Sequence, residues 1–264
     1  MKKAQAILGV PVRKPLHLYR FKNHPYLSMS FDGVGEFFKP VKKVIDPKAY
    51  LEEVPDQQGR LQELYRTEPE VLFPAPDFSF VGRHHGYAPV EIKVATMLGQ
   101  KHYNPVKAIY NEARMLMGID PWQEAPKPLA LSELQTMSVE EKAAYFGIPV
   151  YYYPQVQQEM MAVDANGGFL AVMFETEWQI YIFYVQKDPI LWNQIINMGL
   201  KAAQAVNNLA AKEGRGPIMA LTPEMDKQMS RTRTELQQEM PRPSPLIGEP
   251  ERKTPNAQWL DDEF

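Results

Sequence analysis

The stretch PAPDFSFVGRHHGYAPVEIKV, from Pro74 to Val94, decides which fold is expected for this chain. Two short runs rich in apolar residues flank the turn-like sequence GRHHGY, and such a pattern predicts a β-hairpin. Charged residues interrupt both runs: Asp77 opens the first, and Glu91 and Lys93 lie two positions apart in the second. Because strand side chains alternate, Glu91 and Lys93 share one face. Polar residues on a half-buried strand suggest a functional site.

Helical and strand-like patterns alternate on both sides of this stretch. Periodic apolar residues and end signals define each segment. The expected elements are a strand pair within 15–38, helices within 46–73, the 77–94 hairpin, helices at 104–119 and after a capping box at Ser138, a helix at 150–163, a strand pair at 168–185, and a helix opened by Asp188 and Pro189. This order predicts an α+β fold, close to α/β, with a central mixed sheet flanked by helices.

Composition limits the organisation and the function of the chain. With 264 residues, of which 44% are hydrophobic, residues 1–212 can form one domain with a sizeable core. Residues 213–264 are rich in proline and charge, which predicts a mostly disordered tail with a transient helix at 223–239. The net charge of −3 provides no general positive field for nucleic acid. Any such site must therefore concentrate its Lys and Arg residues locally.

The chain contains no cysteine, which excludes disulfides, thiolate metal sites and cysteine nucleophiles. Its first residues, MKKAQAILGVPVRK, are basic, but their apolar run is too short for a signal peptide. No stretch approaches the roughly 18 apolar residues of a membrane-spanning helix. We therefore expect a soluble cytoplasmic protein without membrane contact, located in the host cytoplasm if a phage encodes it.

The charged residues of the predicted hairpin suit a hard divalent cation. Mg²⁺ prefers carboxylate and carbonyl oxygens and keeps positions open for water and phosphate. Asp77 and Glu91 can lie opposite each other on the two strands of the hairpin, and the backbone carbonyl of Ile92 offers a third oxygen ligand. The ammonium of Lys93 would then lie beside the metal, where it can orient a water or stabilise charge on a reacting phosphate.

The sequence resembles the PD-(D/E)XK nucleases, in particular the YqaJ and lambda-exonuclease branch. Pro76-Asp77 followed by Glu91-Ile92-Lys93 is similar to the signature of the superfamily. The segment IPVYYYPQVQQEMMAV, at 148–163, is similar to the family segment in which a tyrosine precedes Gln-Val-Gln on a helix. Two strands and a terminal helix follow in both, so the resemblance covers roughly residues 15–210.

This resemblance implies a Mg²⁺-dependent or Mn²⁺-dependent DNA exonuclease with two metal ions. Its substrate would be the ends of linear double-stranded DNA, and its single-stranded product would pass to an annealing protein in phage-type recombination. Glu91 and Lys93 match the acid and the lysine of the motif, so both are expected to be catalytic with Asp77 and Gln155. Tyr152 matches a tyrosine that borders the active site. Family members can also form toroidal homo-oligomers.

Two candidates compete for the first acid of the motif. Asp77 has the better hairpin spacing. Asp32 has the better local motif, because the family carries Ser-Pro-Asp-Gly and this chain has SFDG at 30–33. Choosing Asp32 would make residues 34–76 an insertion, and it would place Glu63, which matches an auxiliary acid on an upstream family helix, after the first acid. The sequence ranks Asp77 ahead.

The sequence also offers candidates for contacts to DNA and to partner proteins. Arg83, Lys101 and Lys107 are the basic residues nearest in sequence to the expected site, so they are the candidates for binding DNA. The acidic, aromatic end at 259–264 resembles the tips by which single-strand-binding proteins dock their partners. An alternative function is also open, in which the chain is a DNA-binding or phage-assembly protein that keeps the nuclease fold with an altered site.

Overall fold

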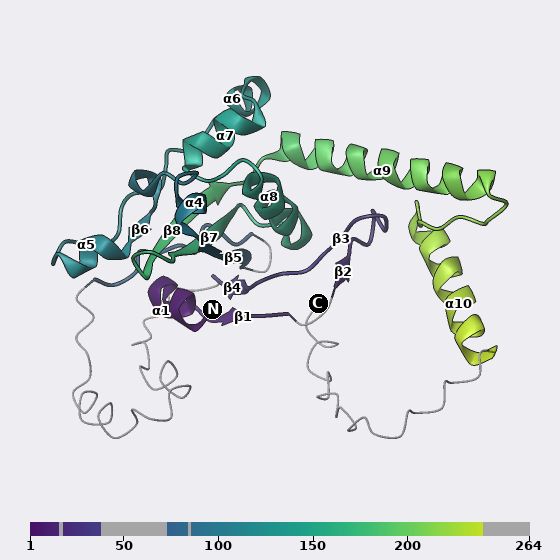
Figure 1. Cartoon of the computed structure of the whole chain (residues 1–264), viewed down its shortest axis with the longest axis horizontal. Coiled ribbons are helices and arrows are strands. Elements are labelled where there is room, and N and C mark those ends of the chain that lie inside the picture. The colour runs from purple at the N-terminus through teal and green to yellow at the C-terminus, as the bar shows by residue number, and fades with distance from the viewer. Residues whose placement is uncertain (16–17, 38–72, 84–85, 240–264) are drawn as a thin grey trace. The chain divides into compact units, whose positions relative to one another are not determined.

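A mixed six-stranded sheet forms the centre of the computed structural model, which describes residues 1–15, 18–37, 73–83 and 86–239. The strand order is β1-β4-β5-β7-β8-β6 (Figure 1). The bounds are β1 Val12–Arg13, β4 Val34–Glu36, β5 Tyr87–Ala95, β6 Tyr110–Asn111, β7 Gly167–Phe174 and β8 Gln179–Gln186, with a separate pair formed by β2 Tyr19–Arg20 and β3 Ser28–Met29. Helices flank the sheet, so the predicted α+β class is confirmed.

Three long strands carry most of the core. β7 and β8 are buried along nearly their whole length, as expected for strands covered on both faces. They pair antiparallel from Gly167 opposite Gln186 to Phe174 opposite Gln179, which confirms the strand pair predicted at 168–185. On its other side β7 pairs with β5 in parallel, whereas β5 pairs antiparallel with β4. β5 is therefore an interior strand, and its polar residues lie inside the fold.

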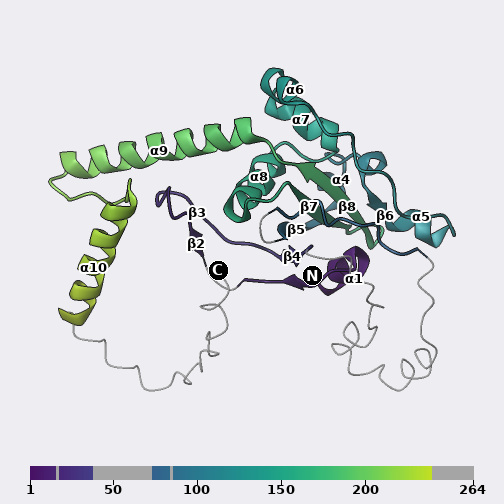
Figure 2. The ribbon, with the colours of Figure 1, turned by 180° about the vertical axis from the view of Figure 1, so that it is seen from behind.

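The helices have the following bounds. They are α1 Lys2–Leu8, α4 Met97–Gln100, α5 Glu112–Leu116, α6 Leu131–Thr136, α7 Val139–Phe146, α8 Tyr152–Val163, α9 Pro189–Lys212 and α10 Pro223–Glu239, with a 3₁₀ turn η2 at Pro105–Lys107. α8 lies along β5 and β7 (Figure 1). The same sheet seen from behind shows α1 beside β1 (Figure 2). α8 is thus the helix that covers the polar residues of β5.

Local signals in the sequence fix the ends of several helices. Ser138 forms the predicted capping box of α7, since its side chain accepts from the Glu141 N–H and Glu141 accepts from the Ser138 N–H. Asp188 caps α9, and Pro189 occupies its first turn. α8 begins at Tyr152. The helices predicted at 150–163 and from Asp188 are therefore confirmed.

A buried ion pair ties these helices together. The Lys142 Nζ lies 2.8 Å from Asp188 Oδ2, and both side chains are almost fully buried. The Tyr153 hydroxyl donates to the same oxygen at 3.1 Å. Burial, followed by the nearby Asp188 carboxylate, raises the pKa of Tyr153. The three groups join α7, α8 and the start of α9, and so they fix the position of α8 over the sheet.

The hairpin predicted at 77–94 is not formed. Its second run is β5, but the described residues 73–83 form turns and irregular structure rather than a strand. The hairpin partner of β5 is β4, which precedes it by a long connection. Asp77 explains the difference locally, because its Oδ1 accepts from the Ser79 N–H at 2.8 Å and so favours a turn.

The helix predicted at 104–119 is also wrong over most of its length. This segment contains the 3₁₀ turn η2, strand β6 and the short helix α5. Asn104 and Asn111 each cap a backbone N–H two residues ahead, which divides the segment into short elements. The predicted strand pair within 15–38 is present as β2 and β3, whereas nearly all of the helical region expected at 46–73 lies outside the described residues.

The chain divides into two compact units, Met1–Pro223 and Glu224–Phe264. The sequence had placed the boundary slightly earlier, at 212. α10 forms the helix expected at 223–239, and residues 240–264, including the acidic end, lie outside the described part. Among the described helices, none combines the length and the apolar character that crossing a membrane requires.

Candidate functional site

The candidate site lies where β4 approaches β5. The Val90 N–H donates to the Gly33 carbonyl at 2.9 Å, which holds the segment before β4 against the strand. A Cβ at Gly33 would lie 2.8 Å from a Val12 methyl group and 3.2 Å from the Val90 carbonyl oxygen, so the close approach requires glycine. Asp32, the preceding residue, is consequently held beside β5. The Ile92 N–H donates to its Oδ2 at 3.3 Å.

Glu91 is the most deeply buried acid of this region, with 1% of its surface exposed. Side chains alternate along β5, so Glu91 shares a face with Pro89 and lies on the side that α8 covers. A Cβ on Gly168 of the neighbouring strand would meet both Pro89 and α8 residues, which confirms that α8 packs there. The Gln155 Nε2 of α8 donates to Glu91 Oε1. Helix and strand therefore meet at the carboxylate.

Lys93 joins the two acids. Its Nζ lies 3.3 Å from Asp32 Oδ2 and also forms an ion pair with Glu91 Oε1. Burial opposes the charged form of Lys93, but the Glu91 and Asp32 carboxylates outweigh it and raise the pKa of the ammonium. The ammonium also lies 5.4 Å from the centre of the Tyr152 ring, at cation–π distance. Lys93 is therefore charged at neutral pH.

Glu159 was not singled out from the sequence, yet it belongs to this cluster. It lies one helical turn beyond Gln155 on α8 and is 2% exposed. Burial raises the pKa of Glu159 to about 10, and the nearby carboxylates of Glu91 and Asp32 add to this shift. The side chain is therefore neutral at pH 7 in the absence of a cation. A signal was present in the sequence, because Glu159 interrupts the apolar face of α8 four residues after Gln155.

Buried carboxyl oxygens without a hydrogen-bond partner distinguish this cluster. Among the described residues, Glu91 Oε2 and both carboxyl oxygens of Glu159 are buried without a hydrogen-bond partner. Buried polar groups in native proteins nearly always have a partner, because leaving one unpaired costs about 1–3 kcal/mol. Asp32, Glu91 and Lys93 leave one net negative charge when Glu159 is neutral. Both observations fit a cation.

The geometry also limits how a metal would be held. In the described ranges, no group of three or more His, Asp or Glu side chains is arranged to hold a metal ion by itself. Mg²⁺ is commonly held by one or two carboxylates and retains several waters. Asp32 and Glu91 therefore suffice as protein ligands for such an ion, with the Ile92 carbonyl as the further oxygen indicated by the sequence.

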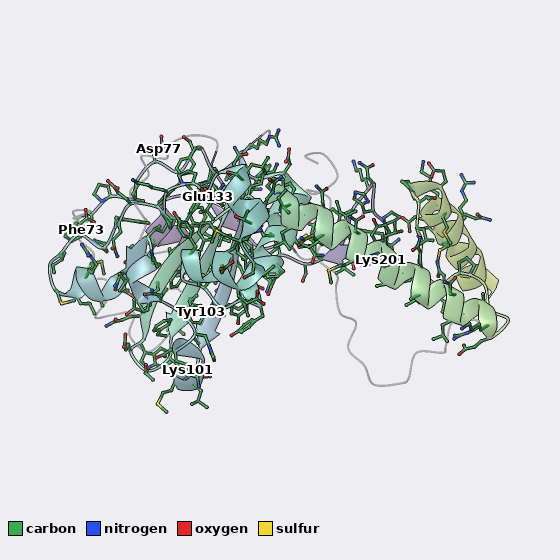
Figure 3. All side chains as sticks on the ribbon, turned by 90° about the horizontal axis from the view of Figure 1, so that it is seen from above. Phe73, Asp77, Lys101, Tyr103, Glu133 and Lys201 are labelled. Carbon is green, nitrogen blue, oxygen red and sulfur yellow. The ribbon has the colours of Figure 1, made fainter. Side chains whose placement is uncertain are left out.

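Asp77, the acid that the sequence ranked first, lies elsewhere. It is exposed, and Figure 3 shows it at the edge of the molecule. The backbone N–H of Ser79 stabilises its charged form and lowers its pKa. Asp32, by contrast, contacts both Lys93 and the Ile92 N–H. The geometry therefore favours Asp32 as the first acid and reverses the ranking from the sequence.

The basic residues expected to bind DNA lie in different surroundings. Arg83 pairs with Asp164 at 3.0 Å, and Asp164 caps the end of α8 that is remote from Gln155. Lys101 lies at the opposite edge of the molecule from Asp77 (Figure 3). The Lys107 ammonium lies 5.7 Å from the centre of the Tyr145 ring. The auxiliary acid Glu63 lies outside the described residues.

Comparisons with protein-family models, with curated proteins and with solved structures find no match for this chain.

Proposed function

We propose that this chain is a Mg²⁺-dependent nuclease that hydrolyses phosphodiester bonds of DNA at Asp32, Glu91 and Lys93. The observation that carries the proposal is the buried Glu91 carboxylate, which has one unpaired oxygen and lies in an ion-pair cluster with Asp32 and Lys93. Two acids and a lysine, brought together by β5 and the segment before β4, are groups that metal-dependent phosphodiester hydrolysis uses. The sequence resemblance to PD-(D/E)XK nucleases supports the same reaction.

Asp32 and Glu91 would hold the cation, with the Ile92 carbonyl as a further oxygen ligand. Their acceptor oxygens match the preference of Mg²⁺ or Mn²⁺. When bound, the ion supplies an acidic water for attack and neutralises negative charge on the phosphate. A second ion is implied only by the family resemblance.

The protein groups have separate tasks in this reaction. The Lys93 ammonium can orient the attacking water and stabilise the charge that develops on the phosphate oxygens. It is charged at neutral pH because two carboxylates face it. Gln155 holds Glu91 from the helix side through its amide N–H, which fixes the direction of the carboxylate. Tyr152 lies against Lys93 and limits the positions that the ammonium can adopt.

The substrate class follows from the resemblance and not from a visible DNA channel. The matching segments belong to exonucleases that digest one strand from the ends of linear double-stranded DNA. We therefore propose the same substrate, with an annealing or single-strand-binding protein as the partner that takes up the product. Homo-oligomer formation belongs to the same proposal.

A second function is favoured by one feature of the cluster. Lys93 already forms ion pairs with both carboxylates, as a purely structural group would. A DNA-binding or phage-assembly protein with a degenerate nuclease site would retain such ion pairs without catalysis. The net charge of −3 also provides no general attraction for DNA.

One assay separates the two functions. The purified chain is incubated with linear duplex DNA labelled at the 5′ or the 3′ end, with Mg²⁺ or with EDTA. The nuclease proposal predicts Mg²⁺-dependent loss of label from one end and no digestion by Asp32→Asn. If wild-type protein binds the duplex but leaves both labels intact with Mg²⁺ and with Mn²⁺, the nuclease proposal fails and the non-catalytic function replaces it.

A further inference from the structure

Glu159 is a buried acid whose carboxyl oxygens lack a hydrogen-bond partner among the described residues. It lies in the middle of α8 with 2% of its surface exposed. Within the described residues, neither of its carboxyl oxygens has a hydrogen-bond partner. Its neighbours on the helix include Val156 and Met160, which are fully buried apolar residues. An apolar residue would therefore suit this position better if packing were the only requirement.

The unpaired oxygens of Glu159 lie close to a second unpaired carboxylate oxygen. Glu91 Oε2 is also buried without a partner. Gln155, one helical turn before Glu159, donates to the other oxygen of Glu91, so helix α8 brings both acids to one place. The described ion pairs of Lys93 are with Asp32 and Glu91 and do not include Glu159. The Glu91 carboxylate and the Gln155 amide both lie within reach of the Glu159 carboxyl group and act on its pKa. Neither forms a hydrogen bond of normal geometry with its oxygens, so a water is the further partner that fits.

We propose that Glu159 binds a water of the cation held by Asp32 and Glu91, and so forms the outer shell of the metal site. This inference rests on the proposed function. A water-mediated role fits because the acids do not form a three-ligand group by themselves, and Mg²⁺ retains several of its waters. Outer-shell groups orient the ligands, and their loss typically lowers metal affinity by about 10- to 100-fold. Glu159 is accordingly a positioning residue.

The test measures cation binding without DNA or catalysis. Mn²⁺ binding to the full chain is titrated by the loss of the free-Mn²⁺ electron paramagnetic resonance signal, for wild type, Glu159→Gln and Glu159→Met. We expect about tenfold weaker Mn²⁺ binding for the glutamine variant and up to about 100-fold weaker binding for the methionine variant. The methionine variant loses more because it cannot accept a hydrogen bond from water.

A matched control is available in Glu112, another buried acid with defined partners. Glu112 pairs with the Lys3 ammonium and accepts from the Ile180 N–H at 2.7 Å. Glu112→Gln should leave Mn²⁺ affinity unchanged. Thermal unfolding without metal should show that both Glu159 variants are at least as stable as wild type, because each removes an unpaired buried carboxyl group.

The outcomes distinguish this inference from the proposed function. Wild-type Mn²⁺ affinity in both folded Glu159 variants would overturn the outer-shell role while leaving the nuclease proposal intact. Unfolding of both variants in metal-free buffer would also overturn it, since Glu159 would then be a structural group. Absence of Mn²⁺ binding by the wild-type chain would refute the metal site itself, and the proposed function with it.

Discussion

Replacing Lys93 with methionine separates the catalytic role of the ammonium from the binding of the cation. The side chain keeps a similar length, but its charge is lost. Asp32 and Glu91 then face each other without the ammonium that pairs with both. The cluster changes from one net negative charge to two at neutral pH. Hydrolysis and cation binding should consequently change in opposite directions.

The magnitudes follow from the geometry of the cluster. Removing a positioned charge from the developing phosphate charge should reduce the rate on the order of 10²- to 10³-fold. Breaking a buried ion pair lowers the free energy of unfolding by about 3–5 kcal/mol. We expect the lower end of this range for Lys93→Met, because the side chains of Lys93 and Asp32 are 23% and 37% exposed. The additional negative charge should strengthen Mn²⁺ binding by at least about tenfold, because like-charge repulsion between the ammonium and the ion is removed.

Three measurements check this prediction. End-labelled duplex reports the rate, urea unfolding with and without Mg²⁺ reports stability, and Mn²⁺ titration reports affinity. Lys212→Met, which removes an exposed charge at the end of α9, serves as the control and should match wild type in all three. Hydrolysis by Lys93→Met within tenfold of wild type would refute the catalytic role. Weaker Mn²⁺ binding would refute the placement of the ion at these carboxylates.

Three further predictions concern single acids and one buried lysine. Asp32→Asn should lower Mg²⁺-dependent hydrolysis by at least about 100-fold, whereas Asp77→Asn should leave the rate within a few-fold of wild type. If digestion assays rank the two variants the other way, Asp77 is the first metal ligand. Lys142→Met should destabilise the fold by about 3–5 kcal/mol in urea unfolding, because the fully buried Asp188 loses its counter-ion; a loss below about 1 kcal/mol would contradict this. Lys187 and Arg83 outweigh the effect of burial and lower the pKa of Asp164 below 3.8, so its ion pairs stabilise the fold above that pH and are lost as the pH falls through the lowered value. Asp164→Asn should therefore be less stable than wild type by up to about 1 kcal/mol at pH 7, and thermal melts should show this difference shrinking as the pH falls below 3.8.

The carboxyl-terminal half of the fold was predictable because its signals are local. The capping box at Ser138, the Asp188-Pro189 start of α9 and the apolar strands around Thr176 each depend on residues close together in sequence. Periodicity and end signals fix such elements without knowledge of the rest of the chain. Gln155 and Glu91 were identified for the same reason, since each lies in a short recognisable motif.

Spacing could not reveal that Asp32 lies beside Lys93, because the strand pairing that brings them together is not local. Asp32 and Lys93 are 61 positions apart, and the pairing of β4 with β5 brings them together. Asp77 lies nearer in sequence, so a hairpin rule selects it. The rule failed because Asp77 favours a turn through its bond to Ser79. Glu159 was not singled out, although it interrupts the apolar face of α8, because the motif that drew attention to this helix ends at Gln157.

The pairing of β4 with β5 also has a consequence for how this chain tolerates change in length. The two strands are held by their own register, from Val34 opposite Pro89 to Glu36 opposite Tyr87, and by the bond from Val90 to Gly33. The entropy of closing a flexible connection rises slowly, by about 0.6 kcal/mol for each doubling of its length. Residues added to or removed from the connection between these strands should therefore alter the folding rate more than they alter the distance between Asp32 and Glu91. The number of residues between these strands can accordingly change while Asp32 and Glu91 still come together.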